Sequence, residues 1–79
     1  LLRIAALVRY ANRELARAEE LLDRYTKLRP NDVGMRRLHG QVQLLLGEAK
    51  AAIATLHPLY RQDPKNFETL LALGQAYLQ

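Results

Sequence analysis

Apolar residues recur along this chain with the spacing of amphipathic helices, three or four positions apart. The clearest stripe is formed by four residues of the central part: Met35, Leu38, Val42 and Leu45. A second stripe follows after a short break and comprises Ala49, Ala52, Ile53, Leu56 and Leu59 or Tyr60. Such spacing places apolar side chains on one face of a helix. No segment alternates apolar and polar residues with a period of two, so the sequence predicts an all-α protein without strands.

Helix breakers divide the chain at four places: near Asn12, Pro30, Gly47 and Pro64. Proline ends helices and glycine is common just after their last turn, so we expect five helices in antiparallel order. Asn31 or Asp32 can cap the third helix, and the fifth begins at Asn66. Pro58 lies inside the fourth predicted helix, where it removes the hydrogen bond to the Ala54 carbonyl and is expected to bend the helix.

The chain repeats itself with a period of 34 residues. A shift of this length superimposes residues of the same kind: Ala18 on Ala52, Leu22 on Leu56, Pro30 on Pro64, Gly40 on Gly74 and Gln41 on Gln75. Such a period is typical of helical repeat proteins. We therefore interpret residues 1–79 as one domain with two units, about 1–30 and 31–64, and a half unit, 65–79. Because the chain starts with Leu and stops after the first helix of a unit, we expect it to be a segment of a longer protein.

Small residues occupy the places where the two helices of a unit would cross. Gly40 and Ala52 take these places in one unit, and Ala6 and Ala18 take them in the preceding one. Helix axes approach to about 8–9 Å only where the side chains at the crossing are small. The small residues therefore predict two closely packed helix pairs.

Each unit matches part of one pattern of large, small and helix-ending residues. In the last unit these are Leu70, Leu73, Gly74 and Tyr77. In the middle unit they are Gly40, Gly47, Ala52, Leu56 and Pro64, and in the first unit Ala6, Ala18, Leu22 and Pro30. In these residues the chain resembles the tetratricopeptide repeat family, although the middle unit departs from it at His39, Gln43 and Leu59 and the first lacks the turn glycine. The resemblance implies antiparallel helix pairs stacked as a right-handed superhelix.

The resemblance also implies where a partner would bind. In this family the first helices of the units line a concave face, whose positions are held here by Arg3, Leu7, Tyr10, Arg37, Gln41, Leu44, Leu71, Gln75 and Leu78. The implied function is a protein–protein interaction scaffold that binds a peptide or protein segment in this groove. Alternatively, the polar members are solvated surface and the aliphatic members pack between units. Chaperone C-termini are not an expected ligand, because the carboxylate-clamp positions carry only one suitable cation, Arg3.

The net charge of +4 belongs to the first half of the chain. Residues 1–37 contain nine Lys and Arg against five Asp and Glu, whereas the charges of the remaining residues balance. This raises an alternative function, a basic module that binds nucleic acid or an acidic partner. A passive structural spacer within a repeat array is a further alternative. Nucleic acid is the less favoured partner, because the basic residues are spread around their helices and are not gathered with aromatic residues.

The chain offers little catalytic chemistry. It contains neither Cys nor Ser, and its two histidines, His39 and His57, lie on different predicted helices without an obvious carboxylate partner. We expect His39 to be partly buried and His57 to be exposed, and neither to bind a metal. No hydroxyl lies in a motif that would activate it as a nucleophile. The sequence therefore predicts no enzyme activity, no cofactor and no metal site.

A narrower resemblance rests on the last part of the chain. The run AIATLHPLYRQDPKNFETLLALGQAYLQ is similar to bacterial tetratricopeptide lipoproteins of exopolysaccharide and PEP-CTERM protein-sorting systems. It implies an exported, membrane-tethered parent protein in the cell envelope, although no apolar run here is long enough to cross a bilayer.

The last predicted helix carries more apolar residues than one neighbour can cover. We therefore expect self-association through residues 67–79.

Overall fold

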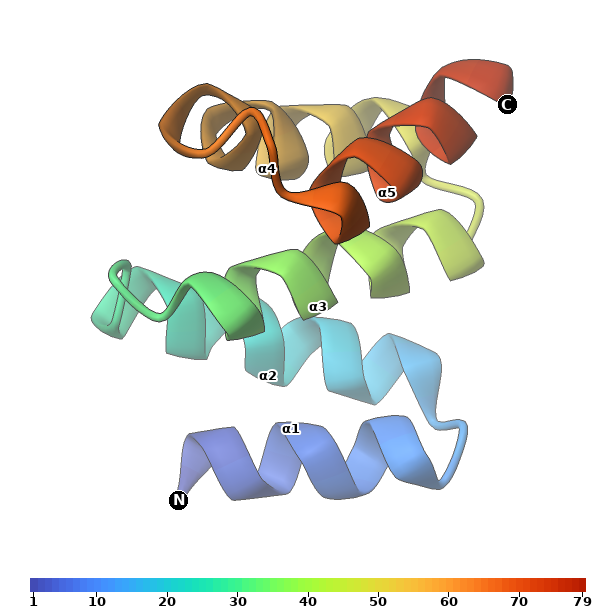
Figure 1. Cartoon of the computed structure of the whole chain (residues 1–79). Coiled ribbons are helices and arrows are strands. Elements are labelled where there is room, and N and C mark those ends of the chain that lie inside the picture. The colour runs from blue at the N-terminus through green and yellow to red at the C-terminus, as the bar shows by residue number, and fades with distance from the viewer.

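The computed structural model describes residues 1–79 and contains five α-helices and no strand (Figure 1). The helices are α1 (Leu2–Ala11), α2 (Leu15–Leu28), α3 (Val33–Leu45), α4 (Ala49–Gln62) and α5 (Phe67–Leu78). The all-α prediction is therefore confirmed, and the breaks between helices fall where the sequence places them. None of the five helices is both long and apolar enough to cross a bilayer.

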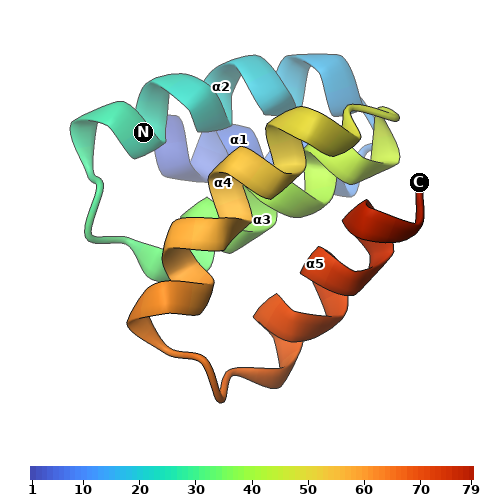
Figure 2. The ribbon, with the colours of Figure 1, turned by 90° about the horizontal axis from the view of Figure 1, so that it is seen from above.

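The helices stack in chain order, and each runs antiparallel to the one before it. In Figure 1, α1 lies at the bottom and α4 and α5 at the top, so the two termini lie at opposite ends of the stack. Each helix contacts its neighbours in the sequence, and α3 also contacts α5. Figure 2 shows α2 and α5 on opposite sides of α3 and α4. The central helix α3 is thus covered by three helices, α2, α4 and α5.

Helices α3 and α5 begin with equivalent side-chain caps. Asp32 Oδ1 accepts a hydrogen bond from the Met35 N–H at 3.3 Å, and Asn66 Oδ1 accepts one from the Thr69 N–H at 3.0 Å. Each cap satisfies a backbone donor that the first turn of a helix leaves unpaired. The two caps are 34 residues apart, as are the first residues of α3 and α5 and both ends of α2 and α4. The period of the sequence is therefore also a period of the backbone.

The turns that end α1 and α3 share one geometry, although only one of them contains glycine. Gly47 has a φ of 80°, and Arg13, at the equivalent place, has a φ of 62°. In both turns the N–H of the following residue bonds back to a carbonyl of the helix: Glu14 to Arg9 at 2.9 Å and Glu48 to Gln43 at 2.8 Å. This bond closes a Schellman-type helix end, whose turn residue needs a left-handed backbone. Arg13 therefore holds a conformation that glycine adopts at lower steric cost.

Small residues lie at the centre of each helix pair, as the sequence predicts. Ala6 and Ala18 are fully buried in the pair of α1 and α2, and Gly40 and Ala52 are buried in the pair of α3 and α4. A Cβ atom at Gly40 would lie 2.6 Å from the Leu56 side chain, which is closer than real Cβ contacts come. The close approach of α4 to α3 therefore requires glycine at this position.

The apolar core consists of two clusters. The first joins α1, α2 and α3 and contains Ala6, Leu22, Met35 and Val42. The second joins α3, α4 and α5 and contains Leu44, Ala52, Leu56, Leu59, Ala72, Leu73 and Ala76. Because α3 contributes to both clusters, its buried residues extend around more of the helix than a single stripe would.

Two apolar residues at helix ends are exposed. Leu45, which the stripe of the third predicted helix placed in the core, is 55% exposed, and Leu28 is 68% exposed. Of the two alternatives for the fourth predicted helix, Leu59 is the buried one. Leu28 and Leu45 are the last residues of their helices, where fewer neighbouring side chains can cover them. Pro58 lies inside α4, which continues beyond it, so this proline does not end the helix.

Candidate functional site

Four of the nine residues assigned to the concave face line one cavity of the structure. They are Tyr10, Gln41, Leu44 and Gln75, and they come from α1, α3 and α5. The cavity has a volume of about 200 Å³, and Leu45 completes its lining. The three helices that the resemblance assigns to a binding face therefore meet at one cavity, to which α2 and α4 contribute nothing.

The cavity combines apolar surface with hydrogen-bonding groups. Tyr10 and Leu45 supply carbon surface, and the carboxamides of Gln41 and Gln75 supply N–H donors and carbonyl acceptors. Leu44 is only 8% exposed and belongs to the core cluster with α4 and α5, so it presents little surface to a ligand. The packing alternative for the aliphatic residues therefore holds for Leu44.

Leu45 is the lining residue that the sequence analysis did not assign to the site. The apolar stripe of the third helix placed it in the core, but its side chain is exposed beside Gln41 and Gln75. A signal was present in the sequence, because residues four apart lie on the same face of a helix and Leu45 follows Gln41 by four.

Arg3 takes part in a network that joins α1, α2 and the start of α3. Its Nε donates to Asp32 Oδ2 at 3.2 Å, and the Tyr25 hydroxyl donates to the same oxygen at 2.7 Å. The hydrogen bond from Tyr25, followed by those from the Met35 N–H and Arg3, holds the pKa of Asp32 below its ordinary value. The same bond to Asp32 raises the pKa of Tyr25. Arg3 therefore connects helices and does not line the cavity.

Arg37 also serves as a connection between helices. Its Nε donates to the Thr69 hydroxyl at 3.3 Å, and that hydroxyl donates to Asn66, the cap of α5. The other aliphatic residues assigned to the concave face are exposed and lie outside the cavity: Leu7, Leu71 and Leu78. Four of the nine residues thus line the cavity together. Arg3 and Arg37 connect helices, and the other three lie on the surface.

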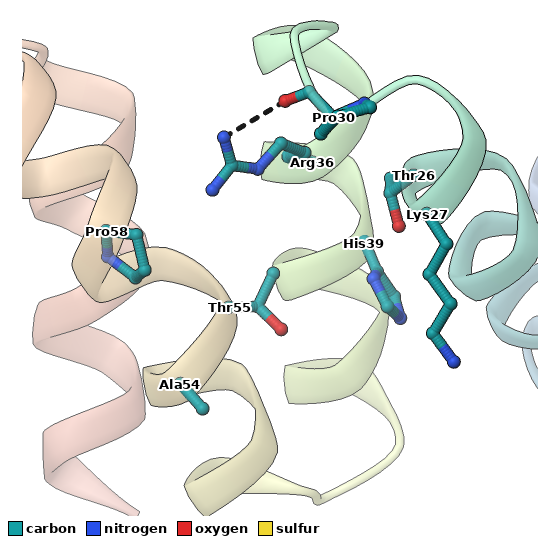
Figure 3. Close-up of a pocket in the computed structure, with 8 residues that line it drawn as sticks. All are labelled: Thr26, Lys27, Pro30, Arg36, His39, Ala54, Thr55 and Pro58. Atoms are coloured by element: carbon teal, nitrogen blue, oxygen red, sulfur yellow. Dashed lines mark hydrogen bonds between the residues drawn. The ribbon is translucent and has the colours of Figure 1, made fainter.

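A larger cavity of about 360 Å³ lies between α2, α3 and α4 (Figure 3). It is lined mainly by polar side chains and two prolines: Thr26, Lys27, Pro30, Arg36, His39, Ala54, Thr55 and Pro58. Several of its donors are already used within the chain. Arg36 donates to the Pro30 carbonyl at 3.1 Å, and Thr55 donates to Gln43 Oε1 at 2.7 Å. The carboxamides of Gln41 and Gln75 in the smaller cavity make no hydrogen bond of this kind within the chain.

His39 contradicts two expectations from the sequence, because it is buried rather than partly buried and it does have a carboxylate partner. It is only 6% exposed, and its Nε2 lies 2.8 Å from Oε2 of Glu19 on α2. The two residues are 20 positions apart and meet only because α2 and α3 pack antiparallel. His57, which was expected to be exposed, is half-buried, and its ring centroid lies 6.1 Å from that of Tyr60.

Three arginines that the sequence analysis described as spread around their helices line a third cavity, of about 220 Å³. Arg9 from α1 and Arg17 and Arg24 from α2 surround it together with Glu20 and Leu21. Arg9 forms an ion pair with Glu14 at 2.9 Å outside this group. The fold therefore brings three arginines and one glutamate together at one place on the first helix pair.

Comparisons with protein-family models, with curated proteins and with solved structures find no match to this chain. The resemblance to tetratricopeptide repeats therefore remains a prediction that rests on the residues and their period.

Proposed function

We propose that this chain is a tetratricopeptide-like helical repeat, stacked as a right-handed superhelix, whose α1, α3 and α5 face binds a peptide segment of another protein. The 34-residue period of the helix ends, caps and turns supports the repeat architecture. The observation that carries the function is the cavity in which Tyr10, Gln41, Leu44 and Gln75 meet.

The size of the cavity favours an elongated ligand over a compact one. Its volume of about 200 Å³ lies below the range of about 300–1,000 Å³ that is usual for small-molecule pockets. It has room for one side chain of a partner. An extended peptide would place an apolar side chain against Tyr10 and Leu45 and would bond its backbone to the carboxamides of Gln41 and Gln75.

Panning a random peptide library against the chain tests this proposal. We expect enriched peptides to bind at least about tenfold more weakly, a loss of about 1.4 kcal/mol, when Gln41 and Gln75 are both changed to Glu. This double change keeps the size of both side chains but removes their N–H donors. Gln62→Glu, at the exposed end of α4, makes the same chemical change elsewhere and is expected to leave binding unaltered.

Two results would overturn the assignment of the site. Equal binding of the enriched peptides to the wild type and to the double variant would place the peptide on another surface. Failure of any peptide to be enriched would favour the alternative of a passive spacer within a longer array.

The arginine cavity supports a second candidate function, the binding of an acidic partner. Arg9, Arg17 and Arg24 provide charge for carboxylates or phosphates, and guanidinium groups suit both by geometry. Filter binding of a polyanion at two salt concentrations tests this candidate. A steep loss of binding at the higher salt that is abolished by Arg17→Ala and Arg24→Ala would support it, whereas undetectable binding at low salt would exclude it.

The proposal includes a cellular setting, the bacterial cell envelope. The similarity of the last part of the chain to bacterial exopolysaccharide and PEP-CTERM tetratricopeptide lipoproteins favours a scaffold in the cell envelope, without catalytic activity. A signal peptide that ends at a lipidated Cys in the parent protein would support this setting, and a cytosolic start would remove it.

A further inference from the structure

Two carboxylates and an imidazole come together between α2 and α3, outside the cavity assigned to peptide binding. Glu19 and Asp23 are four residues apart on α2, so their side chains lie on one face of the helix. His39 reaches them from α3. Each residue offers a ligand atom, and these three atoms all lie within 4.8 Å of one another.

We propose that Glu19, Asp23 and His39 form a binding site for a divalent transition-metal ion of the Zn²⁺ class. The imidazole nitrogen favours zinc-like ions over Mg²⁺ and Ca²⁺, which prefer ligand sets made only of oxygen. Three protein ligands leave one position of a tetrahedral zinc ion for water or another ligand. This proposal departs from the sequence-based expectation that neither histidine binds a metal.

The existing distances need only small side-chain adjustments. Zinc bonds of about 2.0–2.2 Å to nitrogen and oxygen place neighbouring ligand atoms roughly 3.3 Å apart in a tetrahedral site. His39 Nε2 and Glu19 Oε2 are 2.8 Å apart and would separate slightly to admit the ion. Asp23 would move toward them by side-chain rotation, because all three ligand atoms already lie within 4.8 Å.

The three side chains differ in burial. His39 is nearly completely buried and is therefore held in position by its surroundings. Glu19 is about three-quarters buried, and Asp23 is almost half-exposed. The site thus has a fixed ligand at its inner end and an opening toward solvent through which an ion can enter.

Lys27 lies at the exposed end of this group of side chains. Its Nζ lies 3.1 Å from Asp23 Oδ2, and Figure 3 shows Lys27 beside His39. The Lys27 side chain is 76% exposed, and an ion pair in such a position contributes little to stability. A structural hydrogen bond to His39 needs only Glu19. The second carboxylate, from Asp23, is not needed for that hydrogen bond, and a divalent cation would take the place of Lys27 beside it.

Calorimetric titration of the untagged chain with zinc chloride tests the site. We expect one zinc ion to bind per chain, and Mg²⁺ to produce no heat of binding. Glu19→Gln and Asp23→Asn should each weaken zinc binding by at least about tenfold. Lys27→Gln removes the competing ammonium group and should strengthen zinc binding by about two- to fivefold.

Two further measurements distinguish a metal ligand from a residue needed only for folding. Nuclear magnetic resonance of the imidazole nitrogens in the wild-type chain should show that zinc shifts Nε2 of His39 and leaves His57 unchanged. Co²⁺, used as a spectroscopic probe, should give the intense visible absorption of a four-coordinate ion. His57→Gln is the matched control and should retain full zinc binding.

The proposal is overturned by any of three results. The first is the absence of zinc binding at millimolar concentration. The second is binding that Asp23→Asn leaves unchanged, which would mean that His39 and Glu19 form only a structural hydrogen bond. The third is a zinc-induced shift of His57 in place of His39, which would locate the ion elsewhere.

Discussion

Gly40 and Gly74 occupy equivalent places 34 residues apart, but only Gly40 is enclosed. A Cβ atom at Gly40 would meet the fully buried Leu56 at 2.6 Å, whereas one at Gly74 would meet no atom within 4 Å. Overpacking costs about 1–3 kcal/mol, and the gain in helix propensity from Gly to Ala is about 1 kcal/mol. We therefore expect Gly40→Ala to destabilise the fold by up to about 2 kcal/mol and Gly74→Ala to stabilise it by about 0.5–1 kcal/mol.

Urea unfolding of the two glycine variants measures this difference. Because the substitution is the same and both sites are helical, each variant is the control for the other. An equal rise in the unfolding midpoint for both would contradict the close approach of α4 to α3.

Asp32 links the stability of the fold to acid pH. Its pKa in the folded chain lies below the ordinary value of 3.8, chiefly because the Tyr25 hydroxyl donates to it. A lowered carboxyl pKa stabilises the fold above the unfolded pKa, and this contribution disappears as the pH falls through the folded pKa. Asp32→Asn, which keeps a capping side chain, should therefore lose less stability than the wild type between pH 7 and about 2.5.

Tyr25 makes the stability of the fold depend on alkaline pH as well. Its pKa is raised above 10.0 by the hydrogen bond to Asp32, so the neutral phenol is the form that stabilises the fold. This contribution is complete below the unfolded pKa and is lost as the pH rises through the folded pKa. Unfolding midpoints of the wild type and Tyr25→Phe should therefore converge above pH 10, and parallel curves would contradict the network.

At the scale of the element, the turns after α1 and α3 form a natural pair for comparison. Arg13 is held at a φ of 62° where the equivalent Gly47 has a φ of 80°. A left-handed backbone costs a residue with a Cβ about 1–2 kcal/mol. Glycine avoids this steric cost, but it loses more conformational entropy on folding, which offsets part of the gain. We expect Arg13→Gly to stabilise the fold by about 0.5–1 kcal/mol and Gly47→Ala to destabilise it by about 1 kcal/mol.

Thermal unfolding of these two variants followed by circular dichroism checks the turn geometry. A loss of stability in Arg13→Gly would show that the Arg13 side chain makes a contribution larger than its backbone strain.

The elements themselves could be predicted because their signals are local. Asp32 and Asn66 cap helices that begin one residue later, and Gly47 ends the helix before it. The orientation of α3 about its axis could not be derived in the same way. A single stripe assumes one buried face, whereas α3 packs against three helices and buries both His39 and Gln43.

At the scale of the whole molecule, the sequence likewise predicts only part of the candidate site. The family resemblance places Tyr10, Gln41 and Gln75 on one face, and the structure gathers them at one cavity. The resemblance gives no information on which long side chains bond to other groups of the chain. Arg3 and Arg37 were candidates for ligand contact, yet both reach groups on other helices, because a flexible arginine can bond whichever acceptor the packing brings near.

The outer face of α5 leads to the last prediction, which concerns assembly. Gly40 on α3 is covered by Leu56 of the following helix, whereas the equivalent Gly74 is open. Large apolar side chains surround this open position: Phe67, Leu70, Leu71, Tyr77 and Leu78. An apolar surface of this kind favours a partner, and we propose that a second copy of the chain supplies it through the same face.

Light scattering across a hundredfold dilution tests this self-association. We expect the mean mass to rise with concentration, and Tyr77→Glu to shift the transition to at least about tenfold higher concentration by placing a charge in the interface. Leu28→Glu introduces the same charge at an exposed apolar residue of α2 and should leave the transition in place. A monomer at every concentration would contradict the proposal, because it would mean that the exposed face of α5 is stable in water without a second copy of the chain.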